Sequence, residues 1–163
     1  MDPCACSLGG NKLGPAGAAV FAPVLAANGA LKSINLSNNV LCGVDDRGQG
    51  TYTAEGITAI ADALRVNGVN GGLTALDLSS NRLKDEGVRA VCEAIQSNKE
   101  TKLASLNMGQ NSIGPVGVKS VAAMVAFTGT LIKCDLSGND MGEEGKASIR
   151  FAVQGKAGFH LHL

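Results

Sequence analysis

The sequence predicts an α/β fold, a right-handed α/β solenoid of about five repeats with parallel strands on the concave side and helices on the convex side. The first observation behind this prediction is a short pattern around an asparagine that recurs five times along 163 residues. The second is that each recurrence is followed by apolar residues at helical spacing. A chain of this length fits one domain, so we expect a single repeat domain over residues 1–163.

The first half of each repeat predicts a short strand. The five segments read CSLGGNKL, INLSNNVL, LDLSSNRL, LNMGQNSI and CDLSGNDM. Apolar residues stand five and three positions before the asparagine, and this alternation with period two is typical of a strand. The recurring asparagines are Asn11, Asn39, Asn81, Asn111 and Asn139.

The second half of each repeat predicts a helix. A glycine follows the asparagine by six positions in four repeats, and apolar residues recur four and eight positions after that glycine. We expect Asn28-Gly29 and Asn67-Gly68 to end the first two helices, because both residue types tolerate a left-handed conformation. The glycines are Gly17, Gly87, Gly117 and Gly145, with Gly56 in the remaining repeat.

The leucines that begin the later repeats give a basic repeat length of about 28 residues. The second repeat is longer because it carries an insertion over residues 40–55. The expected units are about 3–30, 31–72, 73–102, 103–130 and 131–158, followed by a partial terminal strand at 159–163.

Together the two halves give the pattern L-x-x-L-x-L-x-x-N-x-L with a helix-forming second half. This pattern resembles the leucine-rich repeat of the ribonuclease inhibitor-like class, which also occurs in NOD-like receptors and Ran GTPase-activating proteins. The resemblance covers nearly the whole chain and implies a horseshoe arc whose concave face binds proteins. It also implies an alternative function, that of a GTPase-activating or signalling scaffold. The short chain and the lack of a strongly acidic tail argue against this alternative.

The recurring asparagines are interpreted as scaffolding rather than as catalytic groups. In a stacked solenoid the chain turns away from each strand while its backbone polar groups enter the interior. An asparagine amide offers two donors and an acceptor, which satisfy such groups in its own repeat and in the next. We therefore expect the five asparagines to form a structural ladder.

A row of polar residues is expected on the concave face, because alternation points these residues away from the core. The row consists of Asn35, Asp77, Asn107 and Asp135, with Lys133 beside it. It is a candidate surface for a partner, although this face holds none of the Trp, Tyr and Arg anchors that dominate protein interfaces. Solvated packing between neighbouring strands is the alternative interpretation.

The insertion is the largest departure from the repeat pattern. Asn39 and Gly56 are 17 positions apart, where the other repeats have six. Such insertions map to loops on one rim of a solenoid, often a binding face, whereas a tolerated surface loop is the alternative. The candidate contact residues of the insertion are Asp45, Asp46, Arg47 and Tyr52.

Composition argues against several classes of function. Fourteen basic residues balance fourteen acidic ones, so we expect no nucleic-acid partner. No apolar run approaches the roughly 20 residues of a membrane span, and five cysteines without paired spacing fit reduced cytoplasmic thiols rather than disulfides or a metal site. Because His160 and His162 stand at the chain end, no catalytic constellation and no cofactor site are expected.

These observations predict a non-catalytic protein–protein interaction module whose partner is another protein or a second copy of the chain. The second option rests on the ends of the array, because neither end shows the polar capping unit that solenoids need. A self-associating structural repeat, joined through uncapped ends, is therefore an alternative function.

Overall fold

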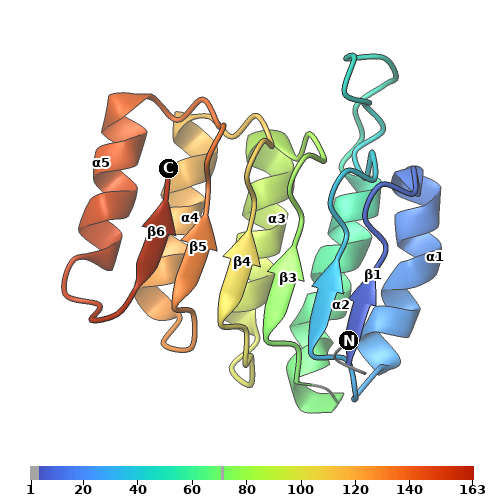
Figure 1. Cartoon of the computed structure of the whole chain (residues 1–163), viewed down its shortest axis with the longest axis horizontal. Coiled ribbons are helices and arrows are strands. Elements are labelled where there is room, and N and C mark those ends of the chain that lie inside the picture. The colour runs from blue at the N-terminus through green and yellow to red at the C-terminus, as the bar shows by residue number, and fades with distance from the viewer. Residues whose placement is uncertain (1–3, 71) are drawn as a thin grey trace.

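The computed structural model describes residues 4–70 and 72–163, and in these ranges the chain forms six parallel strands and five helices. The strands pair in chain order and the helices cover one face of the sheet (Figure 1). The strands are β1 Ala5–Ser7, β2 Ser33–Asn35, β3 Ala75–Asp77, β4 Ser105–Asn107, β5 Lys133–Asp135 and β6 His160–His162. The helices are α1 Gly14–Ala27, α2 Glu55–Asn70, α3 Lys84–Ser97, α4 Pro115–Phe127 and α5 Gly142–Val153. This alternation confirms the predicted α/β solenoid.

The hydrophobic core lies between the sheet and the helices. Parallel pairing places the central residues of the strands side by side, and those of the inner strands are buried. The helices add a second layer of buried side chains at the spacing seen in the sequence. The strand centres are Ile34, Leu76, Leu106 and Cys134, and the helical layer includes Leu25, Ile60, Val91, Val121 and Ile149. The two periodicities of the sequence therefore converge on one core.

The helices begin before the recurring glycine rather than at it. Helix α3 begins at Lys84 and α5 at Gly142, three positions after the repeat asparagine. A methyl group at Gly145 would lie 2.8 Å from the Val118 Cγ1 atom of the preceding helix, closer than carbon atoms tolerate. The recurring glycine therefore permits close packing of successive helices, and it does not mark where the helix begins.

The expected left-handed helix ends are wrong. Asn28 follows α1 with φ −85°, which is extended backbone, and α2 continues through Asn67-Gly68 to Asn70. The Asn28 Oδ1 atom accepts hydrogen bonds from the backbone N–H groups of Ala30 and Leu31 at 3.0 Å. The side chain thus satisfies the turn after α1, so no left-handed residue is needed there.

The repeat asparagines connect each turn to the turn of the preceding repeat. Asn81 Nδ2 donates to the Leu36 carbonyl of the second repeat at 2.9 Å and to its own Leu78 carbonyl at 3.0 Å. Its Oδ1 atom accepts the backbone N–H groups of Asn39 at 2.9 Å and Leu41 at 3.3 Å. Asn111 and Asn39 make the same contacts between repeats, because each donates to a leucine carbonyl of the preceding repeat and accepts the N–H of that repeat's asparagine.

Replacing Asn81 by alanine is expected to lower the free energy of unfolding by roughly 3 kcal/mol, because several buried backbone groups then lack partners. Asn81 is fully buried, whereas Asn11 is exposed and its amide donates only within its own turn, to the Leu8 and Gly9 carbonyls. Asn11→Ala is therefore the matched control and should lose less than about 1 kcal/mol. Urea unfolding followed by circular dichroism measures both, and equal losses would contradict the ladder as the source of stability.

Candidate functional site

The insertion of the second repeat folds into a closed loop that rises beyond the carboxyl ends of the strands (Figure 1). At its base the Thr53 N–H donates to the Cys42 carbonyl at 3.0 Å, and higher up Val44 pairs with Gly50 as an antiparallel bridge. The tip is held by Asp45, whose Oδ1 atom accepts two backbone N–H groups of the loop at 3.0 Å and 2.7 Å. Asp45 is therefore a structural residue of the loop.

Three side-chain contacts fix the insertion to the third repeat. The Tyr52 hydroxyl donates to the Leu83 carbonyl at 2.8 Å, and Arg82 Nη2 donates to the Asp46 carbonyl at 2.9 Å. Lys84 adds a third contact, because its ammonium group lies 4.5 Å from the centre of the Tyr52 ring, within cation–π range. The loop therefore has a defined position relative to the neighbouring turns.

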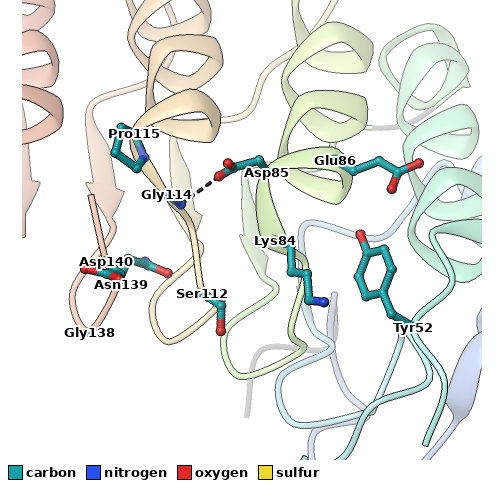
Figure 2. A pocket seen from close by; sticks show the side chains of 10 residues that line it. All are labelled: Tyr52, Lys84, Asp85, Glu86, Ser112, Gly114, Pro115, Gly138, Asn139 and Asp140. Carbon is teal, nitrogen blue, oxygen red and sulfur yellow. Dashed lines mark hydrogen bonds between the residues drawn. The ribbon is translucent and has the colours of Figure 1, made fainter. Parts of the chain in front are cut away.

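The insertion and the strand-to-helix turns enclose two adjoining hollows, which we call the rim groove. The hollow beside the insertion measures about 460 Å³ and is lined by residues that include Val44, Asp46, Arg82 and Gln110. The second, shown in Figure 2, measures about 760 Å³ and is lined by residues that include Tyr52, Lys84, Glu86, Pro115 and Asp140. Ser112 and Gly138 line both hollows, so the groove runs from the insertion to the turn of the fifth repeat.

The rim groove presents charges of both signs. Lys84, Glu86 and Asp140 are exposed; the first two lie at the start of α3, and Asp140 lies in the strand-to-helix turn of the fifth repeat. Asp85 has another role, because its Oδ1 atom accepts the Gly114 N–H at 2.6 Å, directly before helix α4 (Figure 2). A carboxylate at this place is favoured by the helix dipole, so Asp85 stabilises the floor of the groove.

Tyr52 and Cys42 stay neutral beneath the insertion. Burial, together with the neighbouring Cys42 thiol and Glu86 carboxylate, raises the pKa of Tyr52 to about 12. Burial likewise raises the pKa of the Cys42 thiol to about 12. The Tyr52 phenol keeps its proton at neutral pH, as its hydrogen bond to the Leu83 carbonyl requires. Tyr52 therefore serves as an anchor at the wall of the groove.

The concave row forms hydrogen bonds within the sheet. The side-chain oxygens of the four row residues accept the N–H two residues further on, and Asn107 Nδ2 also donates to Asp77 Oδ2 at 3.1 Å. Burial would raise the pKa of Asp135, but hydrogen bonds from Ser137 and His162 outweigh it and lower that pKa. The N–H donors are those of Ser37, Ser79, Gly109 and Ser137. The polar groups of this row thus stabilise the strand ends, while Lys133 remains exposed.

The structure separates the two predicted contact regions. Asp46 and Arg47 lie exposed on the insertion, whereas the concave row lies across the sheet. Sequence reasoning missed Arg82, Lys84 and Asp140, which line the rim groove. A usable signal was present, because each of these residues follows a repeat asparagine by one or three positions and therefore belongs to the same turn.

Comparison with known proteins identifies the repeats. The family profile described as "Leucine Rich repeat" matches residues 73–92 and 99–122. The chain is a leucine-rich repeat protein of the ribonuclease inhibitor-like class. Ribonuclease inhibitor from Mus musculus is 33% identical over 138 residues, which cover 85% of this chain and 27% of that protein. "NACHT, LRR and PYD domains-containing protein 5" from Bos taurus is 30% identical over 86 residues, or 53% of this chain and 8% of that protein.

A solved structure shares the leucine-rich repeat fold. The structure titled "Leiomodin-1 Actin-Binding Site 2 (ABS2)" has a TM-score of 0.64 and 16% identity, covering 90% of this chain and 78% of that one. At this identity the likeness concerns the fold alone. The matched segments span less than a third of the length of the curated relatives named above.

None of the helices described combines the length and the apolar composition of a membrane-crossing segment. Within residues 4–70 and 72–163, no three side chains of His, Cys, Asp or Glu gather in a way that would hold a metal ion.

Tyr52 is the single tyrosine of a chain without tryptophan, so an absorbance titration of tyrosinate reports on this residue alone. The native chain should titrate near pH 12, against pH 10.0 for the unfolded chain. Since the unfolded state loses its proton first, the contribution of Tyr52 to stability should be fully present below pH 10.0 and should be lost as pH rises towards 12. Tyr52→Phe is the control and should lose less stability over this interval, whereas equal midpoints in the native and unfolded chains would contradict the anchored phenol.

Proposed function

We propose that the chain is a non-catalytic interaction module that binds a segment of another protein in the rim groove, with the insertion as one wall. The observation that carries this proposal is the attachment of the insertion to the third repeat through Tyr52 and Arg82. A loop fixed in this way loses little conformational entropy when a partner binds, which favours affinity.

The dimensions and chemistry of the groove favour a protein segment as the occupant. The two adjoining hollows extend over several repeats, further than a compact small molecule requires. Tyr52 and Arg82 line the groove, and these residue types are enriched where protein interfaces gain most of their affinity. Exposed Lys84, Glu86 and Asp140 supply the polar rim that surrounds such contacts.

The concave row supports the proposal less well than the rim. The row oxygens already accept backbone hydrogen bonds, and a partner would have to compete with these. We therefore assign the row a structural role, that of stabilising the strand ends. Lys133 is exposed beside the row and serves as the control position in the experiment below. We further propose that the protein acts in the reducing cytoplasm. The free thiols of Cys42, Cys92 and Cys134 inside the core support this.

Quantitative affinity capture tests the proposal with three matched baits. The first is the wild-type chain, and the second carries Lys84→Glu with Asp140→Lys, which reverses two exposed charges of the groove. The third carries Lys133→Glu on the concave face. We expect proteins retained by the wild-type and Lys133→Glu baits to fall by about tenfold on the groove variant, equivalent to about 1.4 kcal/mol of binding free energy.

Thermal melts of all three baits check the fold, and we expect the exposed substitutions to leave it intact. Retention that persists on the groove variant but is lost with Lys133→Glu would move the contact site to the concave face. A further bait with residues 44–50 replaced by a short glycine–serine linker tests the wall directly, and undiminished retention by that bait would exclude a role for the insertion.

A further inference from the structure

The loops that lead from each helix into the next strand form one edge of the molecule, at the amino ends of the strands (Figure 1). Within the described residues, the charged side chains of these loops are four lysines and one glutamate, namely Lys32, Lys99, Lys102, Lys156 and Glu100. At the opposite edge, the first turns of α2, α3 and α5 carry five acidic residues and one lysine. A chain with no net charge is therefore polarised, and we call its lysine-rich side the basic edge.

The lysines of the basic edge have no structural role that accounts for their charge. In the part of the chain that the structure describes, none of the four forms an ion pair with a carboxylate. The helix dipole would favour a cation in the last turn of a helix, but the last turns of α1, α2, α3 and α4 hold no basic residue. Lys32, Lys99 and Lys102 are exposed, so their ammonium groups can reach an anionic partner.

Two large apolar side chains are exposed at the same edge. Phe127, the last residue of α4, is 84% exposed, and Ile132, directly before β5, is 54% exposed. Counted from the repeat asparagine, Phe127 corresponds to Ser97 of α3, which is also exposed. Helix α4 packs against α3 on one side and α5 on the other, so the geometry of the repeat exposes Phe127, whatever precedes or follows the chain.

Lysines stand on both sides of Phe127. Lys99, from the loop after α3, lines a hollow of about 390 Å³ together with Phe127. Lys156, from the loop after α5, donates through Nζ to the Thr128 carbonyl at 3.2 Å, directly beside Phe127. The basic edge thus combines an exposed aromatic ring with cations from the two neighbouring loops.

We propose that the basic edge docks on an anionic membrane surface, with the lysines at lipid phosphates and with Phe127 and Ile132 among the headgroups. Apolar side chains next to lysines hold peripheral proteins at such surfaces, because insertion and charge attraction both contribute. The residue types favour a membrane over a protein partner, since lysine is depleted at protein interfaces and arginine is enriched there. Among its described residues the basic edge contains no arginine.

Docking through the basic edge leaves the rim groove accessible. The groove lies beyond the carboxyl ends of the strands, and the residues that line it lie outside the basic edge. A docked chain therefore presents the groove on the side away from the membrane (Figure 1). The membrane contact uses other residues than the function proposed above and can fail or hold independently of it.

Co-sedimentation with vesicles tests the charge attraction. We expect the wild-type chain to bind vesicles of phosphatidylserine mixed with phosphatidylcholine and to ignore vesicles of phosphatidylcholine alone. Lys99→Glu with Lys102→Glu should weaken binding to the anionic vesicles by about tenfold. The matched control is Lys12→Glu with Lys119→Glu, which changes the net charge equally at exposed positions outside the basic edge and should weaken binding by less than about threefold.

The same assay tests insertion of the aromatic ring. Phe127→Ala should weaken binding to the anionic vesicles by about fivefold, because less apolar surface enters the headgroup region. Val116→Ala is the matched control, since Val116 is 68% exposed at the other end of α4, and it should bind as the wild type does. Thermal melts check the fold of each variant, and we expect these exposed substitutions to leave it intact.

Several outcomes would overturn the proposal. A wild-type chain that binds both kinds of vesicle equally, or neither, would do so. Equal losses in the two lysine pairs, or in Phe127→Ala and Val116→Ala, would also contradict docking through the basic edge. A wild-type chain that ignores vesicles but binds a glutamate-rich peptide, with binding lost in Lys99→Glu with Lys102→Glu, would replace the membrane by an acidic protein partner.

Discussion

The buried asparagine amide is the interaction on which the rest of the structure depends. After each strand the chain has to turn inside a stack of identical turns, where its carbonyl and N–H groups have no access to water. Asn81 and its counterparts satisfy these groups in two repeats at once. One side-chain type therefore fixes both the path of the turn and the spacing between repeats.

This constraint also determines where variation is tolerated. Residues beside the ladder asparagine, such as Arg82 and Ser112, lie on the turn but outside the buried network, so their side chains differ between repeats. The insertion begins in the same turn, directly after Asn39. The rim thus combines a rigid, repetitive base with variable side chains, whereas the concave row uses its polar atoms to hold the strand ends.

Much of the architecture was predictable because one pattern repeats five times, and the strands, the helical faces and the alternation all follow from it. The local backbone was less predictable. Val40 adopts φ 58°, in the left-handed region that β-branched residues rarely enter, because its position in the turn is set by the neighbouring repeats. The contacts of Tyr52 and Arg82 were beyond prediction for a related reason, since they join segments that only the folded array brings together.

The closed base of the insertion has a practical consequence. Because the Cys42 carbonyl and the Thr53 N–H are bonded to each other, the segment between them begins and ends at neighbouring points of a rigid scaffold. Its tip, around Arg47 and Gly48, is exposed. The chain therefore offers a grafting position for protein engineering, at which libraries of foreign loop sequences can be displayed beside a groove whose floor stays constant.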